Sequence, residues 1–440
     1  MSTALDSRLI EPSIPDSTSH LEPDPIPTLV FVDPSKPGAA QKNIHTRWHP
    51  EIPCIASIPL SQPFKVQCLD YSGSQVHNDD NADDILHLNH DSDHHVSGPF
   101  DVPSARPGDV LEVEILDVRP FEGEHKWGWC CTAQGLGSLD ADQESGEGET
   151  RVTKSIWDFD GDHTSSRHVP HVKFKGRPHP GILGTAPSHD LLAEWHRRES
   201  ELESTTVGGA GVSLPKVRGA YVGQDLAEGL RRRIYEEGAR TGPGREHGGN
   251  IDIGLATVGS KMYLPVYIPG ASLSVGDLHF CQSDGEPTTA IEMAGIITLR
   301  VNIIPDGVAQ LGLKAPMFTT SPSEPIYGER ICFTGLGVGP DGVQSNQSGS
   351  IAYRSAAFQA ISYLRKFGYT REQAYILLAA APIESRVVAT ANKPNFIISI
   401  GIPLGIFDFD ISPKARLAGI GGVKEGEKGL AEPTEDAQGG

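Results

Sequence analysis

Apolar and polar residues alternate with a period of two along the clearest elements of this chain. In the stretch 109–118, DVLEVEILDV, residues Leu111, Val113 and Ile115 share one face, and the glutamates between them take the other. The stretch 296–305, IITLRVNIIP, alternates in the same way. This period predicts strands with one face in the core, rather than helices.

Other apolar patterns complete the prediction of the fold. The stretches 262–270 and 395–404 are more continuously apolar, which is typical of strands buried on both faces. Helical spacing occurs in 351–367, a capping box at 370–373 precedes the run AYILLAAA, and a shorter helix is expected over 190–203. We therefore predict a mainly β fold, like an elaborated sandwich or barrel, with a few helices mostly towards the C-terminal half.

The composition agrees with this class of fold. The 440 residues include 49 glycines and 34 prolines, a combined share well above the roughly 12% of an average protein. Because both residues destabilise helix interiors, a helical bundle and a coiled coil are excluded. We expect one large folded body at 26–412, with flexible tails at 1–25 and 413–440 where polar, Pro-rich or Gly-rich sequence lacks apolar anchors.

The charge and the cysteines narrow the class of protein. The 37 Lys and Arg residues against 57 Asp and Glu give a formal net charge of −20, which disfavours binding to nucleic acid phosphates. No apolar run approaches the ~18 residues of a membrane span, and the N-terminal sequence does not resemble a secretory signal. Six cysteines without a CxxC pair fit a reducing compartment. We therefore expect a cytoplasmic protein that binds neither nucleic acid nor membranes.

Histidine and aspartate are concentrated in the stretch 76–100, VHNDDNADDILHLNHDSDHHVSGPF. Neutral imidazole and carboxylate are the usual ligands of zinc and related ions, so a subset of these side chains can form a metal site. No strict ligand spacing is present, and a polar loop with Asx turns explains the composition equally well. His94 stands out because a turn signal, Ser97-Gly98-Pro99, follows it closely.

A second group of polar residues is interleaved with apolar stretches in 244–254 and 264–295. Asp277 and His279 are its sharpest element, because residues i and i+2 of a strand point to one face and can bind one ion together. Carboxylates among buried strands are costly unless they are paired or ligating, which favours a site over a bulge with its own hydrogen bonds. The polar members are Glu246, His247, Asn250, Asp252, Asp277, His279, Gln282, Asp284, Glu286 and Glu292.

Familiar catalytic motifs are absent from the sequence. It contains no GxSxG elbow, no HExxH helix and no GxxxxGK[ST] loop. The Trp129-Cys130-Cys131 segment offers a thiol nucleophile, but a cysteine beside a tryptophan is more often a core residue.

The second group nevertheless resembles a known family. The order and spacing of GGNID, LPVYIPGA, GDLHFCQSDGE and AIE resemble the acetamidase/formamidase family. Further similar stretches are YSGSQVHNDDNADD, HHVSGPFDVPSARPGDVLEVEILDV, GILGTAPS, YTREQAYILLAAAPIESRV and IPLGIFDFDI, which are closest to the formamidase branch. The resemblance covers roughly residues 26–412 and identifies this body as a catalytic domain. Ser283 stands where the family pattern leads us to expect a glycine.

The resemblance implies an enzyme that hydrolyses a short-chain amide, formamide first, to formate and ammonia, and that assembles as trimers or hexamers. It also implies a site assisted by a divalent metal, most simply zinc. Such a site must activate water, stabilise a tetrahedral oxyanion and protonate the leaving nitrogen. The residues implied are Asp252, Asp277, His279 and His94 as metal ligands, Glu286, Asp277 and His279 as catalytic residues, and Asn250 and Gln282 as substrate-binding residues.

Two alternatives stay open on the sequence alone. Within the enzyme class, acetamide replaces formamide as the substrate, because the sequence does not name the side chains that line the acyl pocket. Outside it, the chain is a non-catalytic β-rich protein that binds a metal or a carbohydrate through its His/Asp-rich run. Ammonia release from formamide separates the two classes.

Overall fold

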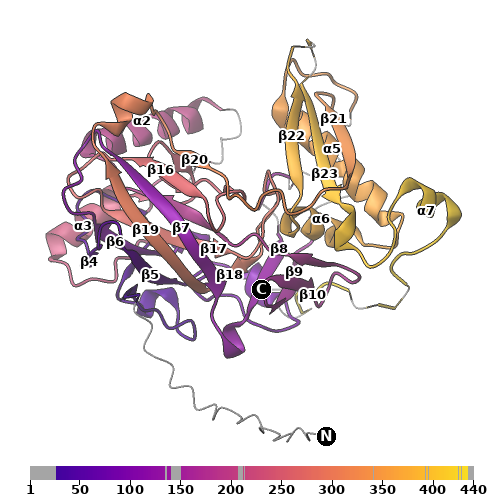
Figure 1. Ribbon diagram of the computed structural model, residues 1–440, viewed down its shortest axis with the longest axis horizontal. Coiled ribbons are helices and arrows are strands. Elements are labelled where there is room, and N and C mark those ends of the chain that lie inside the picture. Colours follow the sequence, from indigo (N-terminus) through magenta and orange to yellow (C-terminus); the bar gives the residue numbers. More distant parts are fainter. Residues whose placement is uncertain are drawn as a thin grey trace, which may run out of the picture.

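The computed structural model shows a broad body of β-sheets beside a smaller lobe, which contains the strands β21–β23 and the helices α5–α7 (Figure 1). The predicted N-terminal tail, 1–25, lies outside the described residues. The residues that the structure describes are 26–133, 136–139, 150–206, 212, 214–339, 341–391, 393–394, 396–424, 426–427 and 429–434.

One layer of the body is a six-stranded sheet with the order β1-β5-β19-β7-β16-β20. Its long central pair is antiparallel, running from Gly295 opposite Pro120 to Ile304 opposite Val110. Leu111, Val113 and Ile115 are fully buried, so the predicted alternation is confirmed. The bounds are β1 Thr28–Val30, β5 Pro63–Cys68, β7 Val110–Pro120, β16 Lys261–Pro265, β19 Gly295–Ile304 and β20 Met317–Thr319.

The second layer is a twelve-stranded sheet with the main order β11-β10-β9-β8-β18-β17-β12-β15-β14; β6 pairs with β17, β2 and β4. Its strands are β2 Ile44–His45, β4 Ala56–Ser57, β6 Val96–Asp101, β8 Trp127–Thr132, β9 Thr153–Asp160, β10 His163–Ser166, β11 Lys173–Lys175, β12 His179–Gly184, β14 Gly244–Arg245, β15 Gly248–Asn250, β17 Leu273–His279 and β18 Glu292–Met293. Every residue of β17 is buried. Polar side chains on this strand therefore need partners inside the protein.

The two large sheets pack face to face around one apolar core. Phe64 and Val66 from β5 belong to the same buried cluster as Phe100 from β6 and Val275 from β17. A small two-stranded sheet pairs β3 (Arg47–Trp48) with β13 (Ala239–Arg240) at the side of the body. The mainly β, sandwich-like fold predicted from the alternation is thus confirmed.

The lobe is a three-stranded sheet, β21-β23-β22, with one helix packed on it. Its strands are β21 Arg330–Leu336, β22 Glu384–Ala389 and β23 Ile397–Pro403. Helix α5 (Gly349–Arg365) covers β21 and β23, and α6 (Arg371–Ala380) lies against β8 of the body. The predicted capping box is present, since Thr370 Oγ1 accepts from the Gln373 amide and the Gln373 side chain accepts from the Thr370 amide.

The remaining helices are α1 Asp83–Leu86, α2 His189–Thr205, α3 Glu228–Glu237, α4 Gly307–Leu311 and α7 Pro413–Ala418. The predictions over 190–203 and 351–367 match α2 and α5, whereas α3 was not predicted. Within the described residues, none of the helices has the length and the apolar character needed to cross a membrane.

The two continuously apolar stretches form strands, but these are not buried on both faces along their whole length. In β16, Tyr263 stays half-buried between its buried neighbours Met262 and Leu264, because alternate residues of a strand point to opposite faces of the sheet. In β23, the residues from Ile397 to Ser399 are half-buried, whereas those from Ile400 to Pro403 are buried.

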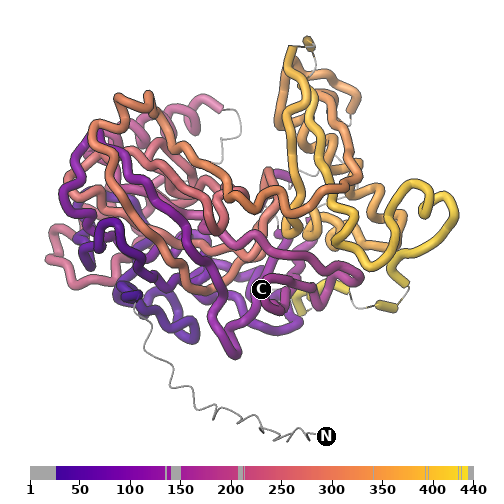
Figure 2. The backbone as a smooth tube through the Cα atoms, viewed as in Figure 1, coloured from indigo at the N-terminus to yellow at the C-terminus, as the bar shows by residue number. Residues whose placement is uncertain are grey.

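The segment after residue 412 that we predict to be a flexible tail makes contacts with the body. Ala431 forms an antiparallel bridge with Lys154 on β9, and the Thr434 amide donates to Asp83 Oδ1 at 2.6 Å. The end of the chain accordingly runs back from the lobe to the body (Figure 2). The limits of the folded body remain a prediction.

Candidate active site

The register of three neighbouring strands gathers ionisable side chains at the end of β17. His279 on β17 lies opposite His179 on β12 and opposite Glu292 on β18. Residues directly opposite one another in antiparallel strands share a face, and so do residues two apart in one strand. Asp277 therefore joins this group, as its spacing from His279 predicts.

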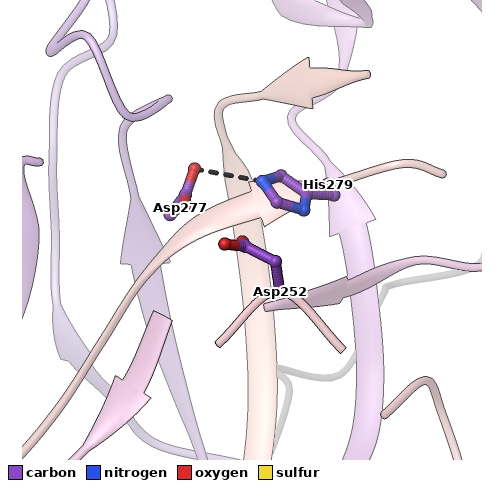
Figure 3. Close-up of side chains that lie close together, drawn as sticks. All are labelled: Asp252, Asp277 and His279. Atoms are coloured by element: carbon purple, nitrogen blue, oxygen red, sulfur yellow. Dashed lines mark hydrogen bonds and ion pairs between the residues drawn. The ribbon is translucent and has the colours of Figure 1, made fainter. Parts of the chain in front are cut away.

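Asp252 reaches the same place through the strand on the other side of β12. β15 pairs with β12, and the loop after β15 is tied down where the Asp252 amide donates to the Gly181 carbonyl at 3.3 Å. A Cβ added at Gly181 would lie 2.6 Å from Asp277 Oδ2 and 2.7 Å from Asp252 Oδ1. Gly181 thus leaves the space in which Asp252, Asp277 and His279 come together (Figure 3).

Glu286 comes from the loop between β17 and β18, which the C-terminal helices hold. Tyr375 on α6 donates its hydroxyl hydrogen to the Pro287 carbonyl at 2.6 Å. The Asp284 amide donates to the Ile383 carbonyl at 2.9 Å. Glu286 and the preceding Gly285 both have positive φ, at 34° and 92°. The lobe therefore fixes a sharp turn that presents the Glu286 carboxyl group.

His279 is surrounded by polar partners on both sides of its ring. Its Nε2 lies 3.1 Å from Asp277 Oδ1 and 3.3 Å from Glu292 Oε2. Its Nδ1 lies 3.0 Å from Gln282 Oε1, and the same oxygen is 2.9 Å from His179 Nε2. The carboxylates thus face one edge of the ring, and a neutral amide and a second imidazole face the other.

Gln282, which we predict to bind substrate, contacts both histidines of the site. Its amide oxygen faces His179 and His279, and its amide nitrogen donates to the Asp252 carbonyl at 2.9 Å. The side chain is buried behind His279 and is not among those that line the neighbouring cavity. Its contacts are those of a residue that positions His279 and the Asp252 loop.

The pKa values of the group show an excess of negative charge. Burial raises the pKa of Asp252 to about 6 and that of Glu292 to about 8. Removal from solvent and the charge of Asp252 raise the pKa of Glu286 well above its usual value. For Asp277, burial is outweighed by the positive charge of His279, which lowers the pKa to about 2. At His279, burial lowers the pKa, but the negative charges of Glu292 and Asp277 outweigh it and raise the pKa well above the ordinary value.

A cavity of about 290 Å³ opens next to these groups. Four of the predicted site residues line it, namely His94, Asn250, Asp277 and Glu286. His94 comes from the loop before β6, where its Nδ1 lies 3.1 Å from Thr241 Oγ1. The other lining residues are Tyr71, His90, Asp93, Leu136, Arg240, Gly242, Thr288, Thr289 and Glu292.

The donor atoms fit a divalent cation. Those of Asp252, Asp277 and His279 lie within 4.8 Å of one another, and so do those of His279, Glu286 and Glu292. Asp252 Oδ1 is buried and receives no hydrogen bond from the described residues. A buried carboxylate oxygen without a donor, beside one imidazole and several carboxyl groups, is costly unless a cation balances it. His94 belongs to neither set of donors.

Cys130 does not supply a nucleophile, and two carboxylates of the His/Asp-rich run are engaged away from the centre. Burial raises the pKa of Cys130 to about 12, so its thiol is not poised as a nucleophile. Within the run, Asp79 and Asp84 each lie 2.8 Å from the buried Lys154 ammonium, so these carboxylates form a structural ion pair. The non-catalytic reading, in which this run is the ligand site, therefore loses two of its candidate ligands.

The motifs that suggested a family are arranged around this cavity, and comparison with known proteins settles the membership. Residues 31–409 match the Acetamidase/Formamidase family. The chain belongs to the acetamidase/formamidase family. It is therefore a hydrolase that acts on amide C–N bonds, as the sequence motifs implied.

Individual relatives match this member of the family along nearly their full length. The chain is 41% identical to a formamidase of Methylophilus methylotrophus, over 88% of this chain and 95% of that protein. It is 39% identical to an acetamidase of Mycolicibacterium smegmatis, over 85% and 94%. The solved structure of a gamma lactamase from Delftia acidovorans superposes with a TM-score of 0.85 at 38% identity, covering 92% of this chain and 100% of that one.

The sequence motifs indicate three residues of the site only weakly or not at all, namely Glu292, His179 and Tyr71. Glu292 was one acidic residue among ten polar ones, although its place in the apolar run AIEMAG is a usable signal. His179 gave no signal, because only the pairing of β12 with β17 brings it to His279. Tyr71 lines the cavity from a loop more than 200 residues away from β17 in sequence, and nothing local to it indicates this.

Proposed function

We propose that this enzyme hydrolyses formamide to formate and ammonia in the cavity beside His279. The observation that carries the proposal is the group formed by Asp252, Asp277, His279, Glu286 and Glu292. Three of its four carboxyl groups, those of Asp277, Glu286 and Glu292, line a cavity of about 290 Å³. Amide hydrolysis needs groups that hold, take and return protons around a polarised carbonyl, and this group contains them.

We further propose that Asp252, Asp277 and His279 hold a divalent cation, zinc being favoured by a donor set of one imidazole and two carboxylates. Bound there, such an ion polarises the amide carbonyl and acidifies a water molecule. His94 is a further proposed ligand. Its support is that it lines the same cavity as Asp277.

The carboxyl groups divide the proton transfers between them. Asp277, with its pKa lowered to about 2, stays ionised, and in the site without a cation its Oδ1 lies 3.1 Å from His279 Nε2. Burial and the charge of Asp252 raise the pKa of Glu286, which favours its protonated form. We assign to Glu286 the delivery of a proton to the departing nitrogen, because an amine leaves only when it is protonated. Gln282 and His179 orient His279 from behind.

Acetamide and a cyclic amide are the competing substrates, since relatives of similar identity are named acetamidase and gamma lactamase. A panel of formamide, acetamide, a γ-lactam and urea, assayed on purified protein whose metal content is measured in parallel, tests the assignment. We expect the largest kcat/KM for formamide, and about one divalent ion per chain. Faster turnover of acetamide or of the lactam would change the assigned substrate but not the assigned active site.

We also propose that the enzyme is a cytoplasmic homo-oligomer, a trimer or a hexamer, that binds neither nucleic acid nor membranes. The net charge of −20 and the sparse cysteines support the compartment and the lack of phosphate binding. Light scattering coupled to size-exclusion chromatography measures the mass directly. A mass equal to that of one chain, 47.2 kDa, contradicts the assembly.

A further inference from the structure

Three side chains that line the cavity carry a buried polar atom with no hydrogen-bond partner among the described residues, and one of these atoms, Glu292 Oε2, is paired with His279 Nε2 at 3.3 Å. The other two have no such ion-pair partner in the described part of the chain. One is the hydroxyl group of Tyr71, and the other is the amide oxygen Oδ1 of Asn250. Both atoms are buried. An unpaired buried polar atom destabilises the folded protein, and it is expected where a ligand supplies the missing partner.

Tyr71 is held so that its hydroxyl group acts as a donor. The residue is only 5% exposed, and its ring lies 5.3 Å from the ring of Trp129 and 5.3 Å from that of His94. Burial and nearby acidic groups, Glu292 among them, keep the pKa of the phenol well above its usual value. The hydroxyl group therefore keeps its hydrogen, and acidic neighbours disfavour the phenolate.

Asn250 is held so that its oxygen acts as an acceptor. Its Nδ2 donates to the Gly242 carbonyl at 2.9 Å. Because a carbonyl oxygen only accepts, this contact fixes which end of the side-chain amide points away from Gly242. The end left without a partner is Oδ1.

We propose that these two atoms recognise the carboxamide group of the substrate, with the Tyr71 hydroxyl donating to the substrate carbonyl oxygen and Asn250 Oδ1 accepting from the substrate N–H. The inference rests on the proposed amidase function, and it deepens it by naming how the site distinguishes an amide from an ester. An ester has the same carbonyl oxygen but no N–H, so Asn250 Oδ1 would stay unpaired in its complex. Tyr71 serves both substrates, since it contacts the oxygen that becomes the oxyanion.

The experiment compares kcat/KM for formamide and for methyl formate in the full-length metal-loaded enzyme and in two variants. For each variant, the change in kcat/KM relative to the wild type is compared between the two substrates. Their different intrinsic reactivities cancel in this comparison. Tyr71→Phe keeps the ring contacts and should lower kcat/KM for both substrates by a similar factor, on the order of 10². Asn250→Ala should lower kcat/KM for formamide at least tenfold more than for methyl formate.

Matched controls lie outside the cavity. Tyr263→Phe removes a hydroxyl group that lies 3.3 Å from Glu112, and Asn302→Ala removes an amide that donates to Glu112 at 3.2 Å. Both should leave the two kcat/KM values within about twofold of the wild type. Thermal unfolding midpoints close to the wild-type value exclude a general loss of structure in the Tyr71 and Asn250 variants.

The outcomes separate this inference from the function on which it rests. A wild-type enzyme that turns over formamide, with a Tyr71→Phe variant of equal activity or an Asn250→Ala variant of unchanged amide-to-ester ratio, overturns the inference and leaves the amidase function standing. A wild-type enzyme that hydrolyses no amide overturns both.

Discussion

The imidazole of His279 offsets part of the negative charge of the acidic side chains in the site. It is the imidazole of both groups of closely spaced donor atoms, and two acidic side chains contact the same ring nitrogen, Nε2. Its pKa is raised well above the ordinary value by Glu292 and Asp277. In the absence of a cation this nitrogen therefore carries a proton that hydrogen-bonds to the carboxylates.

This state of His279 predicts how cation binding depends on pH. A ligating imidazole must be neutral, so binding a divalent ion has to release the proton that Asp277 and Glu292 retain. The folded-state pKa is raised, so the proton competes with the cation, and this competition weakens as pH rises. We expect zinc affinity, measured by competition with a chromophoric chelator at pH 6, 7 and 8, to rise with pH. Affinity that is independent of pH would show that His279 is not displaced from its proton by the ion.

At the scale of elements, the pairing of β12, β17 and β18 builds the centre. β12 contributes His179 and the space at Gly181, β17 contributes Asp277 and His279, and β18 contributes Glu292. The loop after β15 adds Asp252. A shift of one residue in any of these pairings would turn the ionisable side chains to the opposite face of the sheet.

The space at Gly181 gives a direct test of this arrangement. In Gly181→Ala the new methyl group would lie 2.6 Å from Asp277 Oδ2 and from His279 Cε1. We expect at least about a 10²-fold loss of kcat/KM for formamide, because small displacements of catalytic groups cost this much. The matched control is Gly229→Ala on α3, where nothing lies within 4 Å of the added Cβ and activity should be unchanged. Equal activity of the two variants would show that the three side chains need not approach each other at this point.

Local patterns in the sequence predicted the strands and helices better than they predicted which strands lie side by side. The period-two alternation in β7 and β19, the capping box of α6 and the i, i+2 pair Asp277 and His279 are local patterns, and the structure contains them. Which strand lies beside β17 depends on the global packing of two sheets, and no local pattern encodes that. The sequence therefore does not place His179, and it does not predict the contacts of Gln282 with the two histidines.

At the scale of the whole molecule, the lobe and the body cooperate in forming the site. The lobe holds the loop that carries Glu286, through α6 and the segment that follows it. The body supplies the strands. Segments far apart in the sequence meet in the body. Tyr71 lines the cavity, and Ala431 pairs with Lys154 on β9.

Buried histidines should make the folded protein sensitive to acid. Burial lowers the pKa of His45 and of His179 to about 4, from an ordinary value of 6.5. Between these values the unfolded chain binds protons that the folded protein does not, so stability is lost as pH falls from about 6.5 towards 4. Each such histidine contributes a loss of about 2 kcal/mol at pH 4.5. Urea unfolding at fixed protein concentration, from pH 7.5 to 4.5, measures this.

A variant isolates the contribution of one histidine, because Asp70, whose pKa burial raises to about 6, acts in the opposite direction. We expect His45→Gln to show a weaker dependence of unfolding free energy on pH, by up to one proton, whereas the exposed control His163→Gln keeps the wild-type dependence. Parallel curves for His45→Gln and the wild type would contradict this account of acid sensitivity.

The measurement that most directly tests the central claim is the release of formate and ammonia from formamide by the wild type and by Asp277→Asn. Both the ratio of the two products and the rate of their release are measured. The account predicts equimolar products from the wild type. For the variant it predicts a loss of at least about 10³-fold in kcat, because the ionised carboxylate that orients His279 is replaced by a neutral amide. The surface variant Asp117→Asn should keep full activity. A folded Asp277→Asn variant that releases ammonia at the wild-type rate would falsify the assignment of the active site.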